Sequence, residues 1–192
     1  MTRYNGINHL AMVTGDMDMT IRFWRDLLGM RLVAGIGQEG YRHYFFEISK
    51  TDLIAFFEWP GVEKIPDKDH GVAVKGPIAF DHVSIGVNEI DDLIEIKKKL
   101  AAADFWVSEI VDHGFIYSIY SFDPNNIPIE FSYNVPNIEI RKKPKMKDGS
   151  PSSITIEGPE PQIGKWPTYE VDCEAEDDFK IYPGGGKTIA ED

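Results

Sequence analysis

Cysteine is almost absent from this 192-residue chain, in which Cys173 is the only one. A single cysteine cannot form an internal disulfide, and it cannot build a cysteine-rich zinc site. Basic residues are also few, since 20 lysines and arginines face 32 aspartates and glutamates, for a formal net charge of −12. Because so acidic a chain repels nucleic-acid phosphates, we expect no nucleic acid among its partners.

Long hydrophobic runs are missing as well. No apolar stretch approaches the roughly 18 residues that a membrane helix needs, and the first residues lack the apolar core of a signal peptide. We therefore expect a cytoplasmic protein with no membrane partner. With 42% hydrophobic residues, the chain is nevertheless long enough to bury a sizeable core.

An internal repeat is the strongest pattern that the sequence contains. Each copy begins with an apolar strand that carries Asn-His or Asp-His, at His9 and again at His82, 73 positions later. Apolar residues at helical spacing follow, with Asp16 and Asn88 as the expected N-caps and Gly29 as the end of the first helix. Three strand-like runs complete each copy: 32–36, 41–48 and 53–59 in the first, and 106–111, 115–122 and 127–133 in the second.

The repeat predicts an α+β fold of two βαβββ modules, because two copies of one unit usually pack as a pair. The modules span residues 5–60 and 80–134, and a linker rich in proline and glycine, residues 61–79, joins them. Residues 135–192 show no sustained strand or helix period, so we expect a C-terminal extension that is extended or partly disordered. Its aromatic residues, such as Trp166, favour an arm that is partly docked on the core.

Four segments of the repeat carry motifs. They are Asn8-His9-Leu10, the segment 23–29 (Phe-Trp-Arg-Asp-Leu-Leu-Gly), Asp81-His82-Val83 and the segment 120–131 from Tyr120 to Phe131. Together they resemble the vicinal oxygen chelate superfamily, which includes glyoxalases, bleomycin-resistance proteins, fosfomycin-modifying thiol transferases and extradiol dioxygenases. The resemblance implies that the two modules pair around a divalent metal, which His9, His82 and Glu130 would hold.

These three residues also suit a metal site on chemical grounds. Two imidazoles and one carboxylate on separate strands can form a facial triad that leaves up to three positions open. The set favours Fe(II), although Mn, Zn, Co or Ni can occupy the same ligands. Glu130 supports the site, because a carboxylate in an otherwise apolar strand is costly to bury without a partner. A metal-free binding cavity is the alternative interpretation.

Two further residues favour the extradiol dioxygenase branch by resemblance. Tyr120 lies ten residues before Glu130, at a spacing where those enzymes carry a substrate-binding tyrosine, and His113 lies near their acid–base histidine. Either residue could instead be structural, Tyr120 as a core aromatic and His113 as a turn residue beside Gly114. Asn126 stands where the family's hairpin usually has glycine, and asparagine tolerates the left-handed conformation that the turn requires.

The substrate pocket is expected to be lined by Tyr44, Phe46, Phe56 and Glu58 of the first module. Alignment of the last strands of the two modules places Phe56 at the position of Glu130. A phenylalanine cannot supply the fourth protein ligand that a glyoxalase-type site requires. Glu58 has the same facing two residues later, so it is expected to line the pocket or to support a ligand.

The function that these patterns favour is Fe(II)-dependent extradiol cleavage of a catechol-like small molecule. The second hypothesis is a lyase, isomerase or thiol transferase of the same superfamily that uses another divalent metal. The third is a metal-free protein that binds a small molecule. A homodimer is the expected assembly. We expect His70 to be solvated in the linker, whereas His43 can face either the cavity or the solvent.

Overall fold

A computed structural model describes residues 7–66, 70–73, 81–140, 142–145, 147–148, 153–162, 164–165 and 181–183. The chain divides into two units, of which the first comprises Met1–Val135 with Gly185–Asp192 and the second comprises Pro136–Gly184. The first unit contains both predicted modules. In the second unit, the described residues form one short helix, α3 (Ser153–Ile156). The expected docking of Trp166 concerns a residue outside the described part of the chain.

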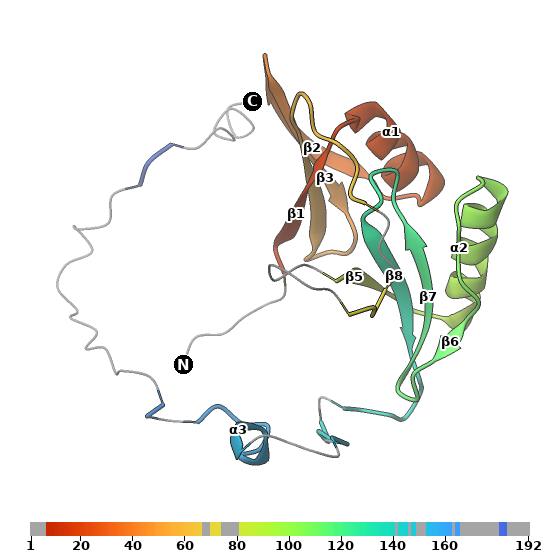
Figure 1. Cartoon of the computed structure of the whole chain (residues 1–192), viewed down its shortest axis with the longest axis vertical. Coiled ribbons are helices and arrows are strands. Elements are labelled where there is room, and N and C mark those ends of the chain that lie inside the picture. Colours follow the sequence, from red (N-terminus) through yellow and green to blue (C-terminus); the bar gives the residue numbers. More distant parts are fainter. Residues whose placement is uncertain are drawn as a thin grey trace. The chain divides into compact units, whose positions relative to one another are not determined.

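The first module has the predicted order of elements, and Figure 1 shows it in red to orange. Asp16 caps the first helix as predicted, since its Oδ1 accepts the Met19 N–H at 2.9 Å. Gly29 ends the helical segment with φ +80°, a conformation that favours glycine. Strand β1 runs parallel to β4 in a mixed sheet of order β1-β4-β3-β2. The elements are β1 (His9–Thr14), α1 (Met17–Ile21), the π-helix η1 (Arg22–Leu27), β2 (Leu32–Gln38), β3 (Tyr41–Glu47) and β4 (Leu53–Glu58).

The second module repeats this topology, with sheet order β5-β8-β7-β6 and β5 parallel to β8. The α+β prediction of two βαβββ modules is therefore confirmed. Asn126 has φ +62° in the β7–β8 turn, as predicted. The elements are β5 (Val83–Val87), α2 (Ile90–Ala102), β6 (Val111–Asp112), β7 (Ile116–Phe122) and β8 (Pro128–Asn134).

Two local predictions for the second module were wrong. The run 106–111 forms no full strand: Val107 makes only an isolated bridge to Ser121, and β6 has just two residues. The N-cap of α2 is Glu89 rather than Asn88. Asp92 determines this start, because its Oδ2 accepts the Glu89 backbone N–H at 3.0 Å, as in a capping box.

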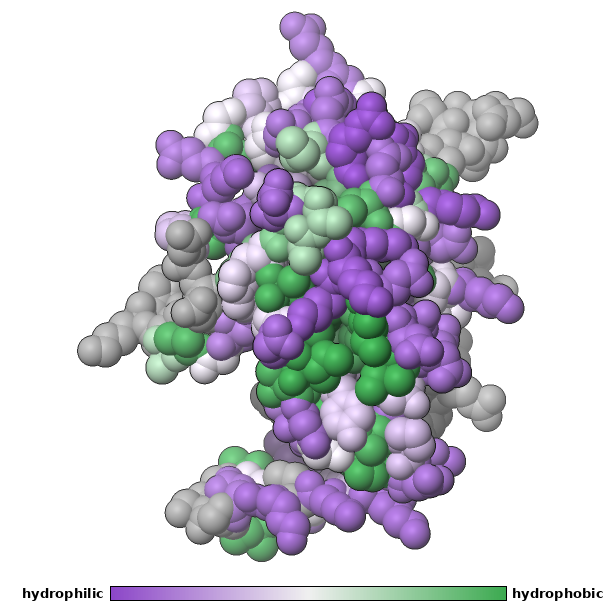
Figure 2. Space-filling view, turned by 90° about the vertical axis from the view of Figure 1, so that its right-hand side faces the viewer, coloured by the Kyte–Doolittle hydropathy of each residue, from purple (hydrophilic) through white to green (hydrophobic). Residues whose placement is uncertain are grey.

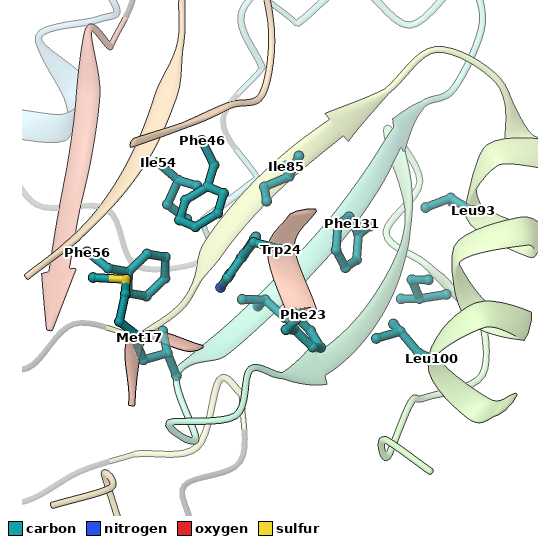
Figure 3. Packing of buried hydrophobic residues seen from close by; sticks show 13 residues of the cluster. Met17, Phe23, Trp24, Phe46, Ile54, Phe56, Ile85, Leu93, Leu100 and Phe131 are labelled. Carbon is teal, nitrogen blue, oxygen red and sulfur yellow. The ribbon is translucent and has the colours of Figure 1, made fainter. Parts of the chain in front are cut away.

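The hydrophobic core lies between the two modules, and η1 contributes its largest side chains. Figure 3 shows Trp24 and Phe23 of η1 between aromatic residues of the first sheet and Phe131 of the second. Trp24 packs on Phe56 with ring centroids 5.7 Å apart, and Phe23 packs edge-on against Phe105 at 4.7 Å. Burial of these large rings is the main source of stability for the pair of modules.

A buried polar network also joins the modules. Asn125, in the β7–β8 turn, accepts a hydrogen bond from Thr14 Oγ1 of β1 at 2.7 Å. Its amide nitrogen donates to Asp123 Oδ2 at 3.0 Å, and its backbone carbonyl accepts from Ile65 N–H at 3.1 Å. Because these groups are buried and satisfied, the network fixes the turn of one module against the first strand of the other.

The surface around α2 is mostly polar. Figure 2 shows hydrophilic residues dominating that side, with apolar residues in patches between them. Lys98 and Lys99 of α2 are exposed, and Lys99 pairs with Glu95 at 2.7 Å. None of the helices in the described part of the chain has the length and hydrophobicity of a membrane span.

Candidate active site

The structure brings His82 and Glu130 together on the second sheet. Nε2 of His82 lies 3.1 Å from Oε2 of Glu130, which is 4% exposed. His82 directly precedes β5, and Glu130 lies in the adjacent, parallel strand β8. Strand alternation places Glu130 on the face opposite to the core residues Ile129 and Phe131. Two of the three predicted metal ligands are therefore close neighbours.

Both first-strand histidines are oriented in the same way. Oδ1 of Asp81 lies 2.6 Å from Nδ1 of His82, and Oδ1 of Asn8 lies 2.8 Å from Nδ1 of His9. A partner on Nδ1 fixes the ring and leaves Nε2 available, which is the usual arrangement of metal-binding histidines. The Asn-His and Asp-His motifs of the repeat thus have the same local geometry.

Electrostatics keep Glu130 ionised and Tyr120 neutral. Burial raises the pKa of Glu130, but the hydroxyls of Ser118 and Ser84 and the charge of His82 outweigh it, so the pKa lies below its ordinary value. Burial raises the pKa of Tyr120, and the nearby Glu130 carboxylate raises it further. Near neutral pH, the site therefore presents a carboxylate beside a protonated phenol.

Tyr120 and His113 form a pair beside these two residues. The Tyr120 hydroxyl lies 2.8 Å from Nε2 of His113, and the Tyr120 ring packs edge-on to His82 with centroids 5.9 Å apart. His113 is also an exposed turn residue, and Gly114 follows it with φ +82°. The interpretation of His113 as a turn residue is thus confirmed, and the turn delivers its imidazole to Tyr120; an acid–base role for His113 stays a prediction.

A cavity of about 470 Å³ adjoins this pair. It is lined by His70, Gly71, His82, Trp106, His113 and Tyr120. The expectation that His70 is solvated was wrong, because its Nε2 bonds to the backbone carbonyl of Ile129 at 3.1 Å and its ring packs on Tyr120. No sequence pattern indicated this, since only tertiary folding brings the linker to β8.

His9 lies apart from the other two predicted ligands. Its ring packs edge-on to Phe45 of the same sheet, with centroids 5.5 Å apart, and its side chain is exposed. Within the described residues, no group of three or more His, Cys, Asp or Glu side chains is placed to hold a metal ion. One chain therefore assembles His82 and Glu130 without His9.

Strand pairing shows which residue of the first module occupies the position of Glu130. In the second sheet, Glu130 pairs with Tyr120 on one side and with Ser84 on the other. In the first sheet, Ala55 pairs with Phe45 and with Ala11. Phe45 corresponds to Tyr120, and Ala11, two residues after His9, corresponds to Ser84, two residues after His82. The alignment that gave this position to Phe56 was wrong by one residue. The first module therefore has no carboxylate at the position of Glu130.

The same one-residue error affects the expected pocket. Phe46 and Phe56 are 0% exposed and belong to the core, and Tyr44 packs against the core from the same side. They do not line the His82 cavity, because a shift of one residue moves a side chain to the other face of a sheet. His43 lies on the His9 side instead, stacked on Phe57 with centroids 3.5 Å apart.

Glu58 contacts a different part of the fold from the one expected. It accepts hydrogen bonds from the Met17 N–H at 2.8 Å and from Nη2 of Arg42 at 2.7 Å. It lines a separate cavity of about 460 Å³ together with Tyr41 and Trp59. Glu58 thus holds the start of α1 against β4 and does not adjoin His82.

Comparisons with known proteins agree with this architecture. A sequence model of the Glyoxalase/Bleomycin resistance protein/Dioxygenase superfamily matches residues 6–131. The lactoylglutathione lyase of Haemophilus influenzae is 28% identical over 134 residues, which cover 67% of this chain and 92% of that protein.

Solved structures share the fold. A glyoxylase/bleomycin resistance protein/dioxygenase domain from Frankia sp. EAN1pec has a TM-score of 0.58 at 18% identity, over 69% of this chain and 100% of that one. Lactoylglutathione lyase from Agrobacterium tumefaciens has a TM-score of 0.51 at 20% identity, over 69% of this chain and 96% of that one. At these identities the likeness concerns the fold alone, but the sequence match spans both modules. The chain belongs to the glyoxalase/bleomycin resistance protein/dioxygenase superfamily, the vicinal oxygen chelate proteins.

Proposed function

We propose that this protein is a metal-dependent enzyme whose site is completed by a second copy of the chain. His82 and Glu130 of one chain and His9 of the other would hold the metal. Two observations support this arrangement. His82 and Glu130 are 3.1 Å apart, whereas His9 has the same Nδ1 partnering but lies on the other sheet.

Within the part of the chain that the structure describes, the His9 side of β1 is exposed. Along this strand, His9, Ala11 and Val13 are exposed, while the alternate residues face the chain's own interior. An exposed strand face that carries Val13 and a prepared imidazole suits contact with a second copy. Closed two-fold symmetry would then create two identical sites in a homodimer.

The residues present fit a divalent metal. Imidazole nitrogen and carboxylate oxygen suit Fe(II), which we favour, and they also suit Mn, Zn, Co or Ni. When bound, such a metal would supply Lewis-acid polarisation and open positions for two neighbouring oxygens of a substrate. Asp81 holds the His82 ring for this task, and the lowered pKa of Glu130 keeps its carboxylate ionised.

Ala55 at the position of Glu130 argues against a fourth protein ligand, because alanine cannot ligate. The proposed site would then have three protein ligands, a pattern that fits extradiol dioxygenases and also thiol transferases. The observation that carries the choice between them is the Tyr120–His113 pair, 2.8 Å apart beside His82. We therefore favour an extradiol-type dioxygenase that acts on a small aromatic molecule. The rings of Trp106 and Tyr120 in the cavity wall suit a planar substrate.

Tyr120 and His113 would act on such a substrate directly. The Tyr120 phenol stays protonated and can donate a hydrogen bond to a substrate oxygen. His113 lies one hydrogen bond behind it, at 2.8 Å, where an imidazole can accept or return a proton. The pair would therefore hold the substrate and move a proton between it and the solvent.

A lyase, isomerase or thiol transferase with another divalent metal is the second candidate. The 28% identical lactoylglutathione lyase favours it, since the match covers 92% of that protein. A metal-free binding protein would use the same cavity without a metal.

One set of measurements separates the three functions. Protein purified without oxygen is analysed for bound metal, reloaded with Fe(II), and assayed for oxygen uptake with a panel of catechols and for lactoylglutathione formation. We expect one metal per chain and oxygen uptake. Lactoylglutathione formation without oxygen uptake would establish the lyase, and absence of metal binding would leave only the binding protein.

A further inference from the structure

We infer that His70 and Gly71, from the segment between the modules, position both metal-ligand candidates of the second module. The inference rests on the proposed function for its metal, but its geometry lies within one chain. These two residues belong to the linker in sequence, yet they line the cavity that adjoins His82 and Tyr120. Gly71 bonds to the residue before His82, and His70 bonds to the residue before Glu130.

Gly71 acts on the His82 side. Its backbone N–H donates to Oδ1 of Asp81 at 3.1 Å, and the same oxygen lies 2.6 Å from Nδ1 of His82. The carboxylate that orients the imidazole is thus itself held by the linker backbone. Gly71 has φ +65°, a backbone conformation that residues other than glycine adopt with strain, so the position suits glycine.

His70 acts on the Glu130 side. Its Nε2 donates to the backbone carbonyl of Ile129 at 3.1 Å, directly before Glu130 in β8. Because a carbonyl oxygen can only accept, Nε2 carries a hydrogen and the ring orientation is fixed. This bond crosses 59 positions of sequence and anchors the linker to the strand that presents the carboxylate.

The His70 ring also forms a wall of the cavity. It packs on Tyr120 with centroids 4.8 Å apart, on Phe122 at 4.9 Å and near His82 at 5.8 Å. These contacts restrict the rotamers of Tyr120 and His82 before any ligand arrives. A site whose groups are held in place binds its ligand with less loss of conformational entropy. His70 is therefore a positioning residue, not a metal ligand.

The test compares three replacements at His70 in the full-length protein. His70→Ala removes the ring and the N–H donor, His70→Gln keeps a donor, and His70→Phe keeps an aromatic ring. Mutation of a residue that supports a metal ligand typically lowers metal affinity by about 10- to 100-fold. We expect His70→Ala to weaken Co(II) binding, measured by calorimetry, by about tenfold or more, with substantial recovery in His70→Gln and little in His70→Phe. Val72→Ala, at an exposed neighbouring position, is the control and should bind like wild type.

A second measurement works without metal. NMR of the metal-free protein detects the hydrogen on Nδ1 of His82, which Asp81 holds at 2.6 Å whether or not Nε2 also carries a hydrogen. We expect this Nδ1–H to exchange slowly with solvent in wild type and faster in His70→Ala, because the loosened linker no longer holds Asp81 in place. This arm tests positioning even if wild type binds no metal, which would refute the proposed function alone.

A merely structural role for His70 gives a different result. Thermal unfolding would shift in His70→Ala, while Co(II) affinity and the exchange rate of the His82 Nδ1–H stayed as in wild type. That outcome would overturn the inference, as would full recovery by His70→Phe, because the ring alone would then suffice.

Discussion

Nε2 of His82 lies 3.1 Å from Oε2 of Glu130, although 48 positions separate the two residues in the chain. The parallel pairing of β5 with β8 creates this contact within one module, and His9 has no part in it. The relationship splits the predicted triad into two residues that one chain assembles and one that it does not. If the site is shared between two copies, the metal content of dimers formed from two different variants can reveal it.

The first prediction concerns a heterodimer of His9→Ala and Glu130→Ala chains, co-expressed with different tags and purified through both. If each site takes His9 from the other chain, one site of the heterodimer has all its ligands and the other lacks two. We expect about half the wild-type metal content, although each variant alone should bind little. Metal analysis of the purified heterodimer measures this.

The matched control pairs His82→Ala with Glu130→Ala. Both changes fall in the same half of the site, so no combination of the two chains restores a complete ligand set. Metal content in this control equal to that of the test heterodimer would contradict the shared site. A wild-type protein that sediments as a monomer while binding one metal per chain would contradict it as well.

The second prediction follows from the contact between His113 and Tyr120. If the protein is an extradiol-type enzyme, His113→Ala should keep its metal and bind catechol, yet turn over about 100-fold more slowly or worse, since general acid–base groups contribute at least that much. Tyr120→Phe should lose less, because a neutral hydrogen bond is worth about 1 kcal/mol. Iron-dependent oxygen uptake across pH 6 to 9 checks both.

The two residues share one hydrogen bond, so their effects should not add. The double variant is expected to be about as slow as His113→Ala alone. A wild-type rate of oxygen uptake in His113→Ala would mean that His113 is a surface turn residue without a catalytic role.

The third prediction concerns Glu58 and the pH dependence of stability. Hydrogen bonds from Arg42 lower the pKa of Glu58 below its ordinary value of 4.5, against the opposing effect of burial. A carboxyl whose pKa is lower in the folded state stabilises the protein above pH 4.5, and this stabilisation disappears as the pH falls through the folded-state pKa. Glu58→Gln should therefore cost about 1–3 kcal/mol at pH 7 and progressively less below pH 4.5.

Urea unfolding of wild type and Glu58→Gln between pH 3 and 7 measures this difference. Glu39→Gln, at an exposed position in the β2–β3 turn, provides the control and should show no such pH-dependent loss. A cost for Glu58→Gln that stayed constant over the whole range would argue for packing rather than charge.

The fourth prediction concerns the network that joins the modules. Asn125→Ala removes a partner of Thr14 Oγ1 and of Asp123 Oδ2, both of which are buried. Thr14 Oγ1 keeps Thr20 and Asp16 as partners, so the main loss is the donor to the buried Asp123 carboxylate. A buried group deprived of a partner costs about 1–3 kcal/mol, and we expect a loss in that range in the free energy of unfolding. Chemical denaturation measures it, with exposed Asn134→Ala as the control. Equal stability of the two variants would mean that water replaces the lost bonds.

Local signals in the sequence were sufficient for the architecture. The 73-residue repeat, the Asp16 cap, the stop at Gly29 and the left-handed turn residue Asn126 all depend on a few neighbouring residues, and the structure confirms each of them. The exceptions are the run 106–111, which forms no full strand, and the start of α2, where the Glu89 and Asp92 pair displaces the expected Asn88 cap. Repeated periodicity is robust, because an error in one residue does not change the pattern.

The faces of the strands were less certain from sequence. Phe56 and Ala55 are neighbours in an apolar run, and such a run shows no alternation that tells one face from the other. Only the pairing of β3 with β4 assigns Ala55 to the position of Glu130 and sends Phe56 into the core. The pocket residues expected from the first module were wrong for this reason.

By itself, then, the sequence determined two βαβββ modules with a histidine at the start of each and a carboxylate at Glu130, since these features are written in local order and in repetition. Tertiary structure alone decided that His82 joins Glu130 without His9, and that His70 of the linker reaches the same cavity. The physical reason is that such contacts join residues 48 and 59 positions apart and depend on how sheets and linker pack, which no short-range pattern encodes.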